Sequence, residues 1–263
     1  MNLILIEPGE LTRDSTVRLS GGRLRHLREV LRVAGGATLR VGLVDGPRGT
    51  AMVQSLDERE AVLACAFDSV IPDRPAVDLL LALPRPKVTR RLFAQLAALG
   101  VGRIMLTNAA RVERDYFDAH ILSAAIYRPL LIEGLQQAKD TRLPLVSIHR
   151  QFRILVEDEL ETLIPAGVRL VAQPGDAPSI GQRAAESGPD RLVLAVGPEG
   201  GWNEFELALL TRHGFLPVGL GPRTLRSDTA CVALLTLAHE ALRQTAFRNC
   251  SKATHDPLGG THR

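Results

Sequence analysis

Two glycine-rich segments near the end of the chain combine groups that can hold a small molecule and act on it. The first is Gly197-Pro198-Glu199-Gly200-Gly201, and the second spans residues 220–230. Glycines leave backbone N–H and C=O groups open to a ligand, because no side chain covers them. The second segment also carries Arg223 and Arg226, whose guanidinium groups suit a phosphate or a planar acceptor. Neither segment is a G-x-G-x-x-G dinucleotide fingerprint or a P-loop.

The first segment is predicted to join a buried strand to a helix. The apolar run 192–196 has high β-propensity and ends at the glycines, as a strand buried on both faces does. Asn203 followed by Glu206 is a capping box, which predicts a helix that begins there and stops at Gly214. Three side chains of this helix are expected to face inward, namely Phe205, Leu209 and Leu210.

The second segment has the same construction. A strand over 216–220 precedes it, and Ser227 is expected to cap a final helix. The two strands are therefore predicted to end side by side in glycine loops, at the edge of a parallel sheet where ligands bind. One such loop would favour an ordinary turn, whereas two together favour a ligand site. The final helix has apolar residues at helical spacing: Cys231, Leu234, Leu235, Ala238 and Leu242.

These segments resemble the signature motifs of the RsmE family, which belongs to the SPOUT superfamily of methyltransferases. The second motif of that family is approximately LG-x-R-I-L-R-x-E-T-A, and this chain has LGPRTLRSDTA, with Asp228 in place of the glutamate. A weaker likeness extends over nearly the whole chain, through 25–32 and 135–140. The chain departs from the family where Pro84-Arg85-Pro86-Lys87 replaces a Lys-Gly pair.

The resemblance implies transfer of a methyl group from S-adenosylmethionine to N3 of a uridine in 16S rRNA, free or in the 30S subunit. For that reaction the N3 proton has to leave, so Glu199 is a candidate base and Arg226 is a candidate to stabilise the charge that develops on the uracil. A carboxylate that only stabilises its turn is the alternative for Glu199. The implied cofactor pocket consists of Ala172, Gly197, Pro198, Glu199, Gly200, Gly201, Leu220, Gly221, Leu225, Arg226, Ser227 and Thr229.

Residues 1–72 are predicted to form a small β-barrel with one helix. Short β-prone runs over 3–6, 16–19, 38–44, 50–55 and 61–67 are separated by turns, and a helix over about 23–31 interrupts them. This helix is densely basic, which fits a solvated face and contact with an RNA backbone equally well. The resemblance implies a PUA-like RNA-binding domain here. Its candidates for RNA contact are Arg23, Arg25, His26, Arg28 and Arg32.

A proline-containing linker at 70–75 leads into an α/β pattern over 76–246. Strands over 78–83, 103–107, 145–148 and 168–172 alternate with helices over about 88–99, 119–138 and 152–163. This alternation predicts an α/β fold with a mostly parallel sheet, and the resemblance adds a trefoil knot and a homodimer. Pro129 is expected to kink or break the longest helix. Residues 247–263 are predicted to be a disordered tail.

Further basic residues lie where loops should face the ligand edge of the sheet. Arg85 and Lys87 follow the first strand of the α/β part, and Arg111 and Arg114 follow the second. These four residues are candidates for RNA contact, with a solvated surface as the alternative. In the same stretch Tyr116 could stack on a base or anchor its loop to the core.

Composition adds few constraints. The 32 basic and 29 acidic residues give a formal net charge of +3, and no apolar run approaches a membrane span. The amino-terminal residues meet Glu7 too early for a signal peptide, so a cytoplasmic protein without membrane association is expected. Three scattered cysteines predict no disulfide framework, and the cysteines and histidines lack metal-ligand spacing, so no metal is expected.

Two alternatives remain beside an rRNA methyltransferase. A SPOUT enzyme could act on another RNA, such as tRNA or 23S rRNA, or a binding module could keep the pocket and transfer nothing. A serine hydrolase built on Ser227, Asp228 and His239 is excluded, because the chain has no G-x-S-x-G. Helical spacing also keeps Ser227 away from His239.

Overall fold

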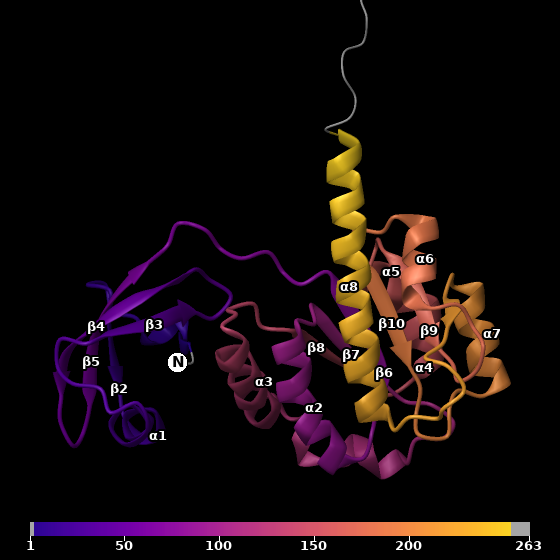
Figure 1. The fold of residues 1–263 in the computed structure, drawn as a ribbon. Helices are drawn as coiled ribbons and strands as arrows, with labels where there is room; N and C mark the ends of the chain where they lie inside the picture. The colour runs from indigo at the N-terminus through magenta and orange to yellow at the C-terminus, as the bar shows by residue number, and fades with distance from the viewer. Residues whose placement is uncertain (1–2, 254–263) are drawn as a thin grey trace, which may run out of the picture. The chain divides into compact units, whose positions relative to one another are not determined.

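The computed structural model describes residues 3–253, except for the side chains of residues 250–253. The chain forms two compact units, and Figure 1 labels most of their helices and strands. The first unit contains the chain up to Arg74 together with Phe93–Ala98 and Ala125–Pro144. The second contains Pro75–Leu92, Leu99–Ala124 and the chain from Leu145 onward. The first unit therefore includes two helical segments that lie beyond the linker predicted at 70–75.

The first unit is built on a five-stranded sheet. Its order is β1-β3-β4-β5-β2, with β1 parallel to β3 and the other neighbours antiparallel. The predicted barrel is therefore an open sheet, because β1 and β2 are edge strands. Both are short, so they offer few hydrogen bonds with which to close it. The strands are β1 (Ile4–Ile6), β2 (Thr16–Leu19), β3 (Thr38–Leu43), β4 (Arg48–Leu56) and β5 (Ala61–Phe67).

A helical segment packs on this sheet and confirms the predicted basic helix. It consists of α1 (Gly21–Arg25) followed by a π-helical turn (His26–Val30). Leu24 and Leu27, one helical turn apart, are buried in the same apolar cluster as the strands. Most of the basic side chains of the segment are left exposed as a result.

The long helix of the first unit is shorter than predicted but is not interrupted. It is α3 (Ala124–Ala138). The helix was predicted to begin at 119, but that part of the chain contains a separate 3-10 turn, His120–Leu122. Pro129 lies inside α3 without breaking it, contrary to the stronger form of the prediction. A single proline removes one hydrogen bond of the ladder, and the turns on either side keep theirs.

The second unit is built on a six-stranded sheet in which all neighbours are parallel, as predicted. Its order is β11-β9-β10-β6-β7-β8. β9 lies between β10 and β11, so the two strands with glycine loops are not neighbours as the sequence suggested. Chain order does not fix sheet order when helices make the crossovers. The strands are β6 (Val77–Ala82), β7 (Arg103–Thr107), β8 (Leu145–His149), β9 (Val168–Ala172), β10 (Leu192–Val196) and β11 (Leu216–Val218).

Helices follow most of these strands and leave the connecting loops at one edge of the sheet. α6 (Ile180–Ser187) was not predicted, although Ser179 and Gln182 form a capping box at its start. Because the strands are parallel, the loops after β6, β7, β9, β10 and β11 all leave the same edge. The other helices are α2 (Pro86–Leu99), α4 (Phe152–Ile154), a π-helical turn (Leu155–Glu159), α5 (Leu160–Leu163), α7 (Glu204–Arg212) and α8 (Ser227–Ala253).

The start of α7 confirms the predicted capping box and corrects one side chain. Asn203 accepts a hydrogen bond from the backbone N–H of Glu206 at 2.8 Å, and the Glu206 carboxylate accepts one from the N–H of Asn203. Leu209 and Leu210 are buried as predicted, but Phe205 is 54% exposed. The capping box turns Glu206 inward, and its neighbour in the helix points about 100° away from it.

α8 begins and ends differently from the prediction. The carbonyl of Arg226 accepts the first helical hydrogen bond, from the N–H of Ala230 at 2.8 Å, so Arg226 rather than Ser227 is the N-cap residue. The helix also runs through 247, where a tail was predicted, to Ala253. At the start of this part of the helix, Nε of Arg248 donates a hydrogen bond to the carbonyl of Gln244 at 3.4 Å. Residues 254–263 of the predicted tail lie outside the described residues.

No helix within residues 3–253 is long and apolar enough to cross a membrane.

Two of the three cysteines lie among the residues whose side chains the structure describes. Cys65 and Cys231 are buried free thiols, and burial raises the pKa of the Cys231 thiol to about 12. Cys231 therefore packs as a small apolar residue of α8, in keeping with its place in the apolar stripe.

Candidate functional site

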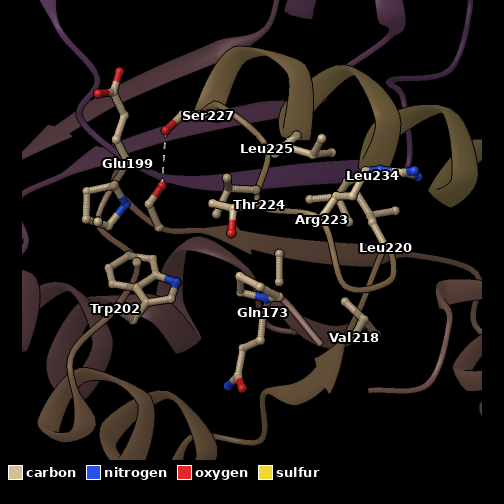
Figure 2. A pocket seen from close by; sticks show the side chains of 18 of the residues that line it. Gln173, Glu199, Trp202, Val218, Leu220, Arg223, Thr224, Leu225, Ser227 and Leu234 are labelled. Atoms are coloured by element: carbon tan, nitrogen blue, oxygen red, sulfur yellow. Dashed lines mark hydrogen bonds between the residues drawn. The ribbon is translucent and has the colours of Figure 1, made fainter. Parts of the chain in front are cut away.

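A cavity of about 370 Å³ lies at the carboxyl edge of the second unit's sheet, where β9, β10 and β11 end. Its walls come from the turn after β9, from both glycine segments and from the first turns of α8 (Figure 2). The volume falls within the range of small-molecule sites in proteins. β9 therefore contributes the strand end that lies between the two glycine loops.

The cavity brings together most of the residues predicted to bind a cofactor. Two members of that prediction, Arg226 and Thr229, lie outside the lining. Both lie in the second glycine segment, where the chain turns into α8. The predicted residues that do line the cavity are Ala172, Gly197, Pro198, Glu199, Gly200, Gly201, Leu220, Gly221, Leu225 and Ser227.

Other parts of the wall were not predicted. Gln173 and Pro174 follow β9, where the sequence offers the single Gly175 instead of a glycine run, and this turn was not predicted as part of the site. Ala230 and Leu234 lie one turn apart on α8, so helical spacing from Ser227 could have identified them. The remaining residues of the wall are Val196, Trp202, Leu207, Val218, Arg223 and Thr224.

The glycines permit the close backbone contacts on which the cavity depends. A side-chain carbon at Gly197 would lie 3.1 Å from the indole of Trp202, which is tighter than normal contact. Gly221 has a φ of +90°, a left-handed conformation that side chains disfavour. Its carbonyl accepts a hydrogen bond from the N–H of Gly175 at 3.3 Å, which joins the turns after β9 and β11. The turns after β9 and β11 thus form one continuous stretch of backbone wall.

The first glycine segment is hydrogen-bonded to the loop after β7. Arg111 donates hydrogen bonds to the carbonyl oxygens of Gly200 and Gly201. The buried carboxylate of Glu206 accepts a hydrogen bond from the backbone N–H of Ala110 at 2.6 Å. Arg111, which the sequence placed among the RNA contacts, therefore has a structural partner in the GPEGG turn.

Ion pairs border the cavity. Asp228 lies 3.1 Å from Arg226 and 3.0 Å from Arg91 of α2. The hydrogen bond between Arg226 and Asp228 lowers the pKa of the Asp228 carboxyl and raises the pKa of the Arg226 guanidinium, so both side chains stay charged. On the first glycine segment, Glu199 lies 3.8 Å from Arg85. Arginines from the loop after β6 and from α2 therefore meet the acidic residues of both glycine segments.

The remaining candidates for RNA contact differ in their surroundings. Arg23 forms an ion pair with Glu10 of the same unit. Lys87 and Arg114 are exposed in the second unit. The exposed candidates in the basic helical segment are Arg25, His26 and Arg28, and Arg32 is exposed just after the segment ends. In the part of the chain that the structure describes, no group of three or more His, Cys, Asp or Glu residues could hold a metal ion.

Trp202 of the cavity wall has a buried hydrogen-bond donor without a partner among the described residues. Its side chain is 7% exposed, and its buried Nε1–H has no hydrogen-bond partner within the described chain. A buried donor without a partner costs about 1–3 kcal/mol. Figure 2 shows the indole ring facing the cavity. The Nε1–H is therefore suited to donate a hydrogen bond to a molecule bound there.

Comparison with known proteins establishes the family. Residues 72–239 match the family model of the RNA methyltransferase domain. The chain is also 30% identical over 249 residues to the ribosomal RNA small subunit methyltransferase E of Treponema pallidum, across 91% of this chain and 92% of that protein. This chain belongs to the small subunit methyltransferase E family. A Borreliella burgdorferi family member, ribosomal RNA small subunit methyltransferase E 1, is 24% identical over 237 residues, 89% of this chain and 95% of its own.

Solved structures share the fold of the present chain over nearly its whole length. A ribosomal RNA small subunit methyltransferase E from Neisseria gonorrhoeae, bound to S-adenosyl methionine, aligns with a TM-score of 0.73 and 24% identity over 91% of this chain and 97% of its own. A putative methyltransferase from Legionella pneumophila, in complex with its cofactor SAM, aligns with a TM-score of 0.73 and 23% identity over 92% and 98%. At these identities the likeness establishes the fold.

Proposed function

We propose that this chain transfers a methyl group from S-adenosylmethionine to N3 of a uridine in 16S rRNA. The observation that carries the proposal is the cavity lined by both glycine segments at the ligand edge of a parallel sheet. Family membership supports the reaction class and the small-subunit rRNA as substrate. The choice of N3 rests on the RsmE-like form of the second glycine segment.

The residues around the cavity fit the cofactor. Val218, Leu220 and Leu234 offer apolar surface for the faces of an adenine ring. The backbone of the glycine segments offers N–H and C=O groups for the ribose and the base edge, and the Nε1–H of Trp202 is a further donor. When bound, S-adenosylmethionine supplies an electrophilic methyl group on a sulfonium centre.

Trp202 makes cofactor binding directly measurable, because it is the only tryptophan in the chain. We expect S-adenosylmethionine to change its fluorescence on binding. We also expect Trp202→Phe to bind the cofactor about 3- to 10-fold more weakly, as the loss of one hydrogen bond to a ligand predicts. Isothermal titration calorimetry of both proteins tests this. Equal affinity in the variant would mean that the indole N–H does not contact the cofactor.

Methylation at N3 of uracil requires a base and a group that stabilises negative charge, and charged side chains at the border of the cavity can supply both. N3 of uracil has to lose a proton, and the negative charge that develops spreads onto the uracil oxygens. We assign Glu199 as the base and Arg226 as the stabilising cation. The Arg226 side chain is 70% exposed, so its contact with Asp228 orients the guanidinium without covering it. The carboxylate of Glu199 lies beside the cavity, 3.8 Å from the guanidinium of Arg85.

The proposal extends to the rest of the chain. Residues 1–72 would form a PUA-like RNA-binding domain, which the exposed basic side chains of its helical segment support. Residues 76–246 would form a knotted SPOUT domain that acts as a homodimer, which the exposed apolar side chains of Val232 and Leu237 on α8 support. The enzyme would then act on 16S rRNA or the 30S subunit in the cytoplasm.

One experiment tests the reaction, the acceptor atom and the substrate together. Methyl-labelled S-adenosylmethionine is incubated with the protein and unmodified 30S subunits, free 16S rRNA or tRNA, and the labelled nucleosides are identified by mass spectrometry. We expect 3-methyluridine in 16S rRNA. Label in tRNA or 23S rRNA, or on a ribose oxygen, would contradict the proposed substrate or acceptor. Cofactor binding with no transfer to any RNA would instead indicate a non-catalytic module.

A further inference from the structure

A second hollow, of about 720 Å³, lies at the same edge of the sheet and has a different lining. Most of that lining comes from the loop after β6 and the first turns of α2. Tyr116 completes it from the 3-10 turn Arg114–Asp118, which follows β7. The other residues are Arg85, Pro86, Lys87, Val88 and Arg91. Among the described residues, none lines both this hollow and the cavity of the glycine segments.

The order of the sheet places the hollow next to that cavity. β6 is the parallel neighbour of β10, so the loop after β6 leaves the sheet beside the first glycine segment. Arg85 of the hollow pairs with Glu199 of the cavity at 3.8 Å. Arg91 of the hollow pairs with Asp228, which also holds Arg226. A molecule in the hollow would therefore border the two residues assigned to catalysis.

The lining of the hollow combines flat or apolar side chains with cations. Pro86, Val88 and Tyr116 supply apolar and aromatic surface, and Tyr116 is partly buried, so little order has to be imposed on its ring. Lys87 is exposed, and the guanidinium of Arg85 has more N–H donors than its single ion pair uses. Aromatic surface beside cations is the combination by which proteins bind unpaired RNA.

We propose that this hollow is the acceptor subsite, in which a pyrimidine nucleotide of RNA stacks its base on Tyr116 and places its phosphates against Arg85 and Lys87. The proposal rests on the proposed function and adds the place where the acceptor base is held. A base stacked within a duplex could not enter the hollow, so the target uridine has to be unpaired or flipped out. Its N3 would then face the border with Glu199 and Arg226.

Photo-cross-linking tests the stacking without relying on activity. The full-length protein is irradiated with 16S rRNA transcripts that contain 5-iodouridine, a base that cross-links to aromatic side chains in stacking contact, and adducts are located by mass spectrometry. We expect an adduct on Tyr116 that Tyr116→Ala abolishes. Phe205 is the matched control, because it is an exposed aromatic residue outside both sites. An adduct on Phe205 with none on Tyr116 would overturn the proposal.

Kinetics give a second measurement. Tyr116→Ala should raise the KM for RNA about 5- to 100-fold, whereas Tyr116→Phe should stay within about 3-fold, because stacking needs the ring and not the hydroxyl. Lys87→Ala should reduce the slope of log KM against log salt by about 1, the effect of one lost phosphate contact. The fluorescence response of Trp202 to S-adenosylmethionine should be unchanged in these variants.

The outcomes separate this inference from the proposed function. If the wild-type protein methylates no RNA, the proposed function fails, and the cross-link still decides what the hollow binds. If the wild-type protein methylates 16S rRNA while Tyr116→Ala keeps the wild-type KM and no adduct forms, the acceptor lies elsewhere and the proposed function stands. A salt effect at Lys87 without an adduct on Tyr116 would assign the hollow to the RNA backbone alone and overturn the base subsite.

Discussion

Replacing Arg226 with alanine is expected to lower the rate constant for methyl transfer about 10²- to 10³-fold, while the dissociation constant of the cofactor changes less than about twofold. Arg226 does not line the cavity, and 70% of its side chain is exposed, so the substitution removes a charge and leaves the wall intact. A cation placed where negative charge develops stabilises the transition state more than the bound substrate. Single-turnover label transfer to 30S subunits measures the rate, and Trp202 fluorescence measures cofactor affinity.

Further variants separate the charge of Arg226 from its placement. Arg226→Lys keeps the charge but loses the two-nitrogen contact with Asp228, so it should retain part of the rate. Asp228→Asn leaves the guanidinium in place without its charged anchor and should reduce the rate less than Arg226→Ala does. Arg212→Ala removes an exposed arginine at the end of α7 and is the matched control. Wild-type activity in Arg226→Ala would remove Arg226 from the mechanism.

Local signals explain why much of this site could be predicted from the sequence. β10 is an apolar run that stops at Gly197, and the capping box of Asn203 and Glu206 starts α7. Both features depend on residues a few positions apart, so their spacing alone defines them. The same holds for the second glycine segment, which needs Gly221 for its left-handed turn. The segments that form most of the cavity wall were therefore visible before the fold was known.

Contacts between distant parts of the chain explain what could not be predicted. Arg111 is 89 residues from Gly200, whose carbonyl it binds, so no spacing rule links them. β9 is inserted between β10 and β11, and only the sheet itself reveals that order. Phe205 was assigned to the core from its apolar character, but the capping box had already fixed which face of α7 turns inward. Local capping chemistry was the stronger determinant there.

Breaking an ion pair at the opposite edge of the same sheet should destabilise the second unit. Asp78 of β6 is fully buried and accepts two hydrogen bonds from Arg191, at 2.6 and 2.9 Å. Arg191 immediately precedes β10, so the pair joins the amino ends of two central strands. Gly102 leaves room for it, since a side-chain carbon there would lie 3.0 Å from the Asp78 carboxylate and 3.2 Å from the Arg191 guanidinium.

Arg191→Ala is expected to lower the free energy of unfolding by about 3 kcal/mol and the unfolding midpoint by about 6–12 °C. The carboxylate of Asp78 would stay buried without its partner, and that desolvated charge is the main cost. The Arg191 side chain is 34% exposed, so the decrease in the free energy of unfolding should lie at the low end of the range for broken buried ion pairs. Circular dichroism during thermal and urea unfolding measures it. Arg153→Ala is the control, because its pair with Glu157 is on the surface and contributes about 0.5 kcal/mol or less.

A double variant tests the cause of this loss. Combining Asp78→Leu with Arg191→Met should recover most of the stability, because apolar side chains of similar length leave no charge without a partner. Both the single and the double variant should keep the wild-type fluorescence response of Trp202 to S-adenosylmethionine below their unfolding midpoints. The ion pair lies at the amino ends of β6 and β10, whereas the cavity lies at the carboxyl edge of the sheet. Loss of cofactor binding in a still-folded Arg191→Ala would mean that strain passes along the strands and that the two edges are coupled.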